Sequence, residues 1–174
     1  MRIELVDLEG GKGEFAHVYQ PADLDLGDEP VSLCGPASIS GKIRQAGTEV
    51  FVNGQVETCV QVDCDRCLKP IQLPVKNDFS LEYMPGTDYE SMHTAELTEE
   101  LMSVSVFDGT SIDVDEIAKE QVLLTVPTRS LCREDCKGFC PTCGADQNLG
   151  ECGCSEVAID PRWAALKDLM NGKS

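Results

Sequence analysis

The sequence predicts an α+β protein with an antiparallel β-sheet or partly closed barrel, two or three helices and a C-terminal zinc-knuckle module. Three observations lead to this expectation. Alternating apolar residues and turn signals fill the segment 31–83. Two helix-start signals follow it, and six cysteines lie between Cys132 and Cys154. A chain of 174 residues has room for one hydrophobic core and a small appendage.

We therefore divide the chain at residue 127. Residues 1–127 are expected to form a mainly antiparallel β domain with an acidic loop and a closing helix. Residues 128–174 are expected to form a cysteine-rich, zinc-binding tail that ends in a short helix.

The strand signals are clearest between residues 37 and 62. Residues 37–43 alternate in polarity, and the Asn53-Gly54 pair is a strong signal for a hairpin turn. Beyond that turn, period-2 geometry should place one set of side chains on one face, with Cys59 on the opposite face. The residues of that set are Val56, Thr58, Val60 and Val62.

Two helices are expected after the strands. Asp113 can cap a helix with Glu116 three residues on, and this helix should end before Pro127. Its buried side is expected to carry Ile117, Leu123 and Leu124. A second helix is expected from Asp160 to Gly172, whereas the polar, acidic residues 86–100 read as a solvated loop.

The charge is strongly negative and unevenly distributed. The formal net charge is -17; residues 1–29 hold eight acids and two bases, and residues 82–120 hold eleven acids and one base. Because such a surface is repelled by phosphate backbones, non-specific nucleic-acid binding is disfavoured. Basic proteins are the easier partners.

The chemistry of the ten cysteines depends on the redox conditions of the compartment in which the protein is found. No apolar stretch approaches the roughly 18 residues that cross a bilayer, and the N-terminus does not read as a signal peptide, so we expect a cytoplasmic protein. Reducing conditions favour metal ligands over five disulfides. Cys34 and Cys59 have no ligand-like spacing and are assigned no role.

Cysteine spacing in the last third predicts a metal site. Cys140 and Cys143 are separated by two residues, with Pro141 and Gly144 favouring a tight turn from which both thiolates reach one ion. Another such pair, Cys64 and Cys67, follows the long predicted strand. The eight candidate ligands are Cys64, Cys67, Cys132, Cys136, Cys140, Cys143, Cys152 and Cys154.

Several arrangements of these cysteines remain open. They suit one zinc site or two sites of four thiolates each, and an iron–sulfur cluster or free, redox-active thiols are alternatives for the C-terminal group. Nothing in the sequence marks a catalytic constellation: the two histidines are not near a nucleophile motif. We therefore expect no enzymatic activity.

Four segments of the chain, in this order, carry a family resemblance. They are 64–68 (CDRCL), 120–127 (EQVLLTVP), 132–144 (CREDCKGFCPTCG) and 160–166 (DPRWAAL). In these segments the chain resembles the YceD-like family of large ribosomal RNA subunit accumulation proteins of bacteria and plastids, although Phe139 stands where the family pattern suggests Leu. The resemblance implies a role in the maturation or accumulation of large-subunit ribosomal RNA in the bacterial cytoplasm.

Three functional hypotheses follow. The first is a non-catalytic ribosome-assembly factor whose acidic segments 1–29 and 82–120 engage a basic ribosomal protein or a precursor particle. The second is direct binding of structured RNA, and the third is a thiol oxidoreductase that uses Cys64 and Cys67. Candidate RNA- or partner-binding cations are Arg66, Lys69, Arg129 and Arg133.

Overall fold

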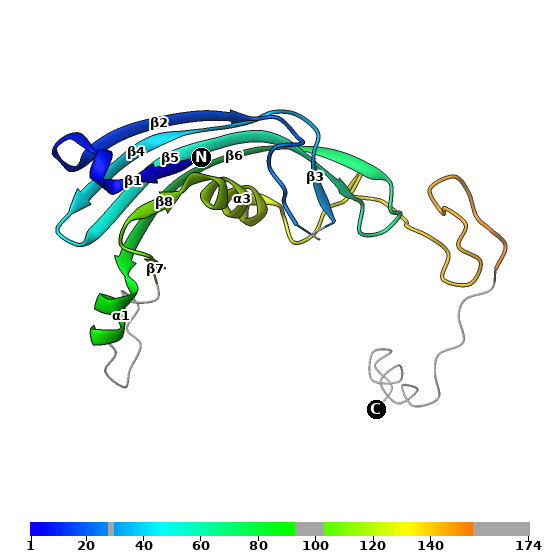
Figure 1. The fold of residues 1–174 in the computed structure, drawn as a ribbon. Helices are drawn as coiled ribbons and strands as arrows, with labels where there is room; N and C mark the ends of the chain where they lie inside the picture. Colours follow the sequence, from blue (N-terminus) through cyan, green and yellow to red (C-terminus); the bar gives the residue numbers. More distant parts are fainter. Residues whose placement is uncertain (28–29, 93–102, 155–174) are drawn as a thin grey trace, which may run out of the picture.

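A computed structural model describes residues 1–27, 30–92 and 103–154, and its main element is a curved, six-stranded open sheet with helix α3 against the concave face (Figure 1). The strand order is β2-β4-β5-β6-β7, and β3 pairs with the far end of β5. The strands are β2 (Lys12–Tyr19), β3 (Val31–Leu33), β4 (Ala37–Ala46), β5 (Glu49–Asp63), β6 (Pro70–Pro85) and β7 (Val104–Phe107).

This architecture confirms the expected mostly β protein with helices, and of the two forms that the sequence left open it shows a sheet and not a closed barrel. The part of the chain described here has two α-helices, α1 (Gly86–Met92) and α3 (Val114–Thr125). The helix expected from Asp160 lies outside the described residues. None of the helices described is long and apolar enough to span a bilayer.

The sequence predicted an antiparallel sheet, but one pair of strands is parallel. β7 pairs in parallel with β6, and Glu82 lies opposite Val104. Parallel neighbours need a crossover connection rather than a hairpin turn. The segment after β6 begins with α1, so the expected solvated loop 86–100 was wrong at its start. Residues 93–100 of that expected loop lie outside the described residues. The two turns of α1 are too short for an apolar period to be recognised.

The predicted hairpin turn at Asn53-Gly54 was also wrong. The chain turns at residues 47–48, and Gly54 lies within β5, directly opposite Gly41 of β4. A Cβ at Gly54 would lie 2.5 Å from the Ser40 carbonyl oxygen and 2.7 Å from the ring of Phe79. Gly54 therefore permits close strand approach under an aromatic ring, which is the other common use of glycine in strands.

The expected division of β5 into two faces is confirmed. Val56, Val60 and Val62 are buried beneath the helix, and Thr58 is half-buried. Cys59 points to the opposite face, where it forms a disulfide with Cys34 across 5.4 Å between Cα atoms. The assignment of no role to these two cysteines was wrong, because antiparallel pairing of β3 and β5 makes them neighbours regardless of their spacing along the chain.

Helix α3 begins as predicted, and the Asp113 carboxylate accepts a hydrogen bond from the backbone N–H of Asp115. Its buried side differs from the expectation at one position: Leu124, in the last turn of α3, is 71% exposed, whereas Leu123 is partly buried. Buried Gln121 accepts a hydrogen bond from the Asn77 amide at 2.9 Å. The buried residues of α3 are Val114, Ile117, Ala118, Gln121 and Val122.

A separate two-stranded ribbon brings the N-terminal residues to the start of α3. Strand β1 (Arg2–Glu4) pairs with β8 (Ser111–Asp113), and two 3-10 turns, η1 (Leu5–Asp7) and η2 (Glu9–Gly11), lead into β2. The glycine-rich segment after β1 is thus part of the turn between two early strands.

Candidate metal centres

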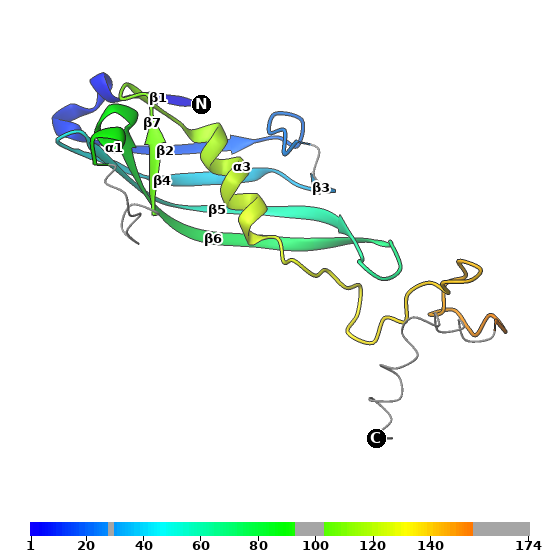
Figure 2. The same cartoon turned by 90° about the horizontal axis from the view of Figure 1, so that it is seen from below.

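The eight candidate ligands form two separate groups of four sulfurs. The inner cluster is Cys64, Cys67, Cys132 and Cys136, and the outer cluster is Cys140, Cys143, Cys152 and Cys154. Within each group the ligand atoms all lie within 4.8 Å of one another. The cysteines thus fall into two groups, which is one of the arrangements that the sequence left open. The inner cluster joins the turn between β5 and β6 to the tail that follows α3, and Figure 2 shows this tail at the end of the sheet where that turn lies.

The first half of the inner cluster is a knuckle formed by the β5–β6 turn. The N–H of Cys64 donates to the carbonyl of Lys69, and the N–H of Leu68 donates back to the carbonyl of Cys64, both at 2.9 Å. Leu68 has φ +52, a left-handed conformation that is costly for a leucine. These bonds hold the sulfurs of Cys64 and Cys67 on the same side of the turn.

The tail is fastened to this knuckle by polar contacts. Asp65 pairs with Ser130 in both directions: its N–H donates to the Ser130 carbonyl, and its carboxylate accepts the Ser130 N–H. The Arg66 guanidinium donates to the carbonyl of Cys136. Gly138 has φ +74, and a Cβ there would lie 2.8 Å from the Arg66 carbonyl oxygen, so this position requires glycine.

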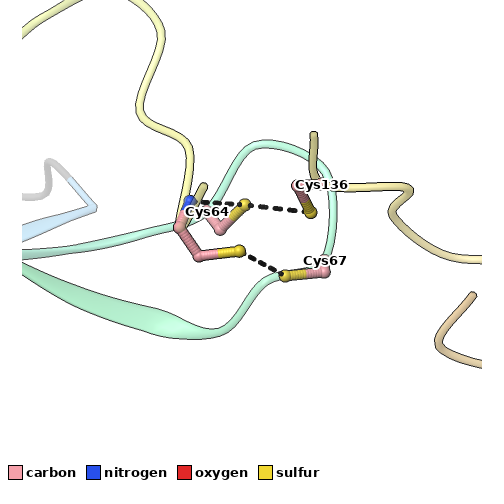
Figure 3. A group of neighbouring side chains, drawn as sticks. Cys64, Cys67 and Cys136 are labelled. Carbon is pink, nitrogen blue, oxygen red and sulfur yellow. Dashed lines mark hydrogen bonds between the residues drawn. The ribbon is translucent and has the colours of Figure 1, made fainter. Parts of the chain in front are cut away.

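The sulfur geometry of the inner cluster fits one tetrahedral ion. The Sγ–Sγ distances are 3.9 Å for Cys64 and Cys136, and 3.6 Å for Cys67 and Cys132. Four thiolates at about 2.3 Å from a zinc ion lie about 3.8 Å apart. Cys64, Cys67 and Cys136 are buried and point toward one another (Figure 3).

Backbone groups favour the thiolate form in the inner cluster. Burial opposes ionisation of Cys64, but N–H groups of Cys132, Arg66 and Cys67 point at its sulfur and lower its pKa to about 6. Burial and the neighbouring sulfur of Cys136 raise the pKa of Cys132 to about 12. Thiolates packed this closely repel one another, and a bound cation removes that repulsion.

The outer cluster is built on a similar turn and is more open to solvent. The Gly144 N–H donates to the Cys140 carbonyl at 2.8 Å, and Gly144 has φ +72 as the turn requires. Backbone N–H groups of Cys143 and Thr142 lower the pKa of Cys140 to about 6. Cys140 is buried, whereas Cys143 and Cys154 are exposed.

Asn148 connects the two clusters. It lies in the loop between the two halves of the outer cluster, yet its side-chain amide N–H donates to Cys136 of the inner cluster at 3.5 Å. Its carbonyl oxygen accepts from the backbone N–H of Lys137 at 2.8 Å and from the Arg133 guanidinium at 2.7 Å. Spacing arguments, which considered only cysteines, missed this residue.

A second connection is an ion pair. Lys69 of the knuckle contacts Asp146 of the outer loop at 2.7 Å, which with the N–H of Asn148 lowers the pKa of Asp146 to about 2. Three of the four candidate RNA-binding cations have partners within the protein: Arg66 contacts Cys136, Lys69 contacts Asp146, and Arg133 contacts Asn148. Arg129 is exposed.

The donor sets indicate what each centre can do. Each group consists of four cysteines, which could hold a soft, tetrahedral cation and leave no coordination position for a substrate. Closed sites of this kind hold chain segments together. Fold and donor sets together define an open-sheet α+β protein with two candidate structural metal centres.

Comparison with known proteins gives the family. The model of the family described as "Large ribosomal RNA subunit accumulation protein YceD" matches residues 52–170, from near the start of β5 to beyond both clusters. The chain belongs to the YceD family, which confirms the resemblance drawn from its motifs.

The similar curated proteins are themselves uncharacterized. One from Mycobacterium bovis is 30% identical over 157 residues, which cover 90% of this chain and 73% of the relative. Protein YlbN of Bacillus subtilis is 27% identical over 158 residues, which cover 90% of this chain and 87% of the relative. No solved structure matches the chain.

Proposed function

We propose that this protein is a non-catalytic ribosome-assembly factor that supports the accumulation or processing of large-subunit ribosomal RNA in the cytoplasm. The observation that carries the proposal is the match to the YceD family over residues 52–170. The closed, all-cysteine donor sets agree with a role that does not involve catalysis at those centres.

The proposed partner is a basic ribosomal protein or a precursor particle that presents one. The net charge of -17 supports this choice, because it attracts basic surfaces and repels exposed phosphate. Direct RNA binding is the competing hypothesis. It is less well supported, since three of its four candidate cations already contact groups within the protein.

The proposed metal is zinc, one ion in each cluster. Zinc prefers four thiolates in a tetrahedron, and the sulfur distances of the inner cluster suit that geometry. A thiol oxidoreductase using Cys64 and Cys67 would instead need an accessible reactive pair, and both residues are buried. The redox hypothesis predicts that Cys67→Ser loses function even where zinc is retained. A Cys67→Ser protein that keeps both its zinc and its function would exclude this hypothesis.

The test is a deletion of the gene in its own host, followed by the ratio of large-subunit to small-subunit ribosomal RNA. The proposal expects this ratio to fall and to recover when the wild-type chain is restored. Sedimentation should also place the protein with large-subunit precursors at low salt and release it at moderate salt. An unchanged ratio in the deletion strain would exclude the proposed role.

The RNA alternative has its own variant. Arg129→Glu reverses an exposed charge that is not part of the contacts between the clusters. Direct phosphate binding predicts weaker association with the precursor in this variant, and binding through a basic protein predicts an association that is unchanged or stronger.

A further inference from the structure

A groove of about 1060 Å³ lies between the C-terminal half of α3, the end of β5 and the segment 126–130. Much of its floor and rim is apolar. The apolar side chains that line it include Val31, Val62, Leu68, Leu123, Leu124 and Val126.

Two leucines at this groove are unusually exposed. Leu124 is 71% exposed on α3, and Leu68 is 62% exposed on the inner-cluster knuckle. Leu68 also has the only positive φ of a non-glycine residue in the described part of the chain. Holding a leucine in that conformation costs roughly 1–2 kcal/mol, and exposing it gives no burial in return. The pair is therefore suited to contact something outside the described residues.

The charges around the groove are mostly of one sign. Four carboxylates line it, and the single cation is Lys119, whose ammonium lies beside Gly27. Two of the acids, Glu116 and Glu120, are exposed on successive turns of α3, in line with Leu123 and Leu124. The other two, Asp63 and Asp65, flank Cys64 on the opposite wall.

We propose that this groove is the docking surface for a basic, amphipathic segment of a partner protein. Apolar side chains of that segment cover Leu68 and Leu124, and its lysines or arginines face the four carboxylates. The proposal rests on the proposed function, whose basic ribosomal partner it assigns to one surface. Charge complementarity carries the choice of occupant.

The inner cluster gains a second role from this placement. Cys64 lines the groove, and Leu68 is positioned by the same turn that presents Cys64 and Cys67 to the ion. Loss of the metal would free the turn that positions Leu68 on one wall of the groove, whereas the wall formed by α3 would stay in place. Docking should therefore depend on the metal, although the partner does not contact it.

Binding of a synthetic probe to the full chain tests the proposal. The probe is a fluorescent helical peptide of lysine and leucine, with leucines spaced i, i+3, i+4. A scrambled peptide of the same composition controls for bulk attraction between charges. Leu124→Lys replaces an exposed apolar contact by a like charge to the probe. Val6→Lys makes the same change at a residue 88% exposed on η1, away from the groove.

The expected result is binding of the helical peptide by the wild type and a loss of about tenfold in Leu124→Lys, the size of effect of one apolar anchor. Val6→Lys should stay within about twofold of wild type, as expected for a distant charge in salt. The scrambled peptide should bind more weakly, and equally to both variants. Equal weakening in both variants, or no preference for the helical peptide, would overturn the proposal.

Two other occupants give distinct results. If residues 155–174 of the same chain fill the groove, removal of that segment will increase affinity for the probe. If a second copy fills it, the wild type will be a dimer in sedimentation and Leu124→Lys a monomer. Either result would overturn the proposal of a separate partner.

The same variants separate this inference from the proposed function. Restoring the deletion strain with Leu124→Lys should leave the large-subunit RNA ratio low, and Val6→Lys should restore it. If both variants restore the ratio, the groove is not the partner site and the assembly role stands. If the deletion never lowers the ratio, the assembly role fails, whatever the peptide does.

Discussion

Val50, Val52, Val56 and Val60 of the central strand are completely buried in the core, whereas the described tail, residues 128–154, buries little besides Ser130, Cys136 and Cys140. The sheet, α3 and the segments packed between them share twenty buried residues in one hydrophobic cluster. At the tail, the corresponding cluster is Cys64, Cys67 and Cys136 with Leu131 packed beside them. Burial of apolar side chains can stabilise the sheet and α3. The tail has no such core, and the buried centre of its contact with the β5–β6 turn consists of cysteine sulfur atoms.

The difference separates two sources of stability in one chain. Removing one core side chain from the sheet leaves many others, so the expected loss is partial. Removing the ion from four thiolates takes away the one interaction that all of them share, so the expected loss is complete for the segment concerned. The following experiments test that contrast, from the largest expected effect to the smallest.

Removal of the metal should have the largest effect, and only in the tail. Strong chelation is expected to abolish amide protection in residues 128–154 and to leave β4 and β5 protected, as measured by hydrogen exchange. Structural zinc sites in small domains contribute about 10–16 kcal/mol of binding free energy, which the tail has no core to replace. Protection that persists in the tail without metal would contradict this view.

Metal counting gives the matched control. Two clusters predict two zinc ions in the wild type, and loss of one ion in each of Cys64→Ser and Cys140→Ser. Cys34→Ser removes the disulfide instead and should leave both ions bound. If the wild type held only one ion, and each cluster variant lost that same ion, the two groups would share one site.

In the sheet, a large single-residue effect is expected for Gly54→Ala. The new Cβ would meet the Ser40 carbonyl oxygen, which is backbone and cannot move cheaply, so we expect a loss of about 3 kcal/mol in urea unfolding. Gly35→Ala is the control, because its Cβ meets only the Cβ of Cys59 at 3.8 Å, an ordinary contact. Metal content should not change in either variant.

Asn148→Ala should weaken the inner cluster without removing a ligand. Its amide donates to the sulfur of Cys136, and loss of such an outer hydrogen bond typically costs 10- to 100-fold in metal affinity. Competition with a chromophoric chelator measures this change. Leu149→Ala, at a neighbouring residue that is 84% exposed, should leave the affinity unchanged. Equal affinities in both variants would show that the outer loop does not support the inner cluster.

The smallest expected effect is at the start of α3. Asp113→Ala removes the helix cap and should cost about 1 kcal/mol of sheet-domain stability in urea unfolding. Asp113→Asn can still cap the helix and loses only the exposed ion pair with Arg2, so its cost should stay within about 0.5 kcal/mol. Similar losses in the two variants would indicate that the ion pair, not the cap, is what matters.

Local patterns in the sequence predicted much of the sheet and the ligands. The alternation in β5 and the Asp113 cap depend on neighbours within a few residues, and both were confirmed. The same reasoning failed at Gly54, because a glycine that allows two strands to approach carries the same signal as one in a turn. It failed at Leu124, which is 71% exposed in the last turn of α3 although it lies seven residues after the buried Ile117, on nearly the same side of the helix.

Other features depend on contacts between distant segments. Spacing identified the eight cysteines but not their division into two groups, since Cys64 and Cys132 meet only when the tail folds back onto the β5–β6 turn. The Cys34–Cys59 disulfide depends on strand pairing. Asn148 could be recognised only once its loop was placed against Cys136.

The short segment from Cys136 to Cys140 limits the distance between the two clusters. Its two ends are ligands of different clusters, and four residue steps separate their Cα atoms by at most about 14 Å. Two ions held at these ends are therefore permanent near neighbours, whatever the rest of the tail does. If cobalt replaced zinc in one cluster alone, its unpaired electrons would shift and broaden the nuclear resonances of the other, so magnetic resonance could follow both centres through a single substitution.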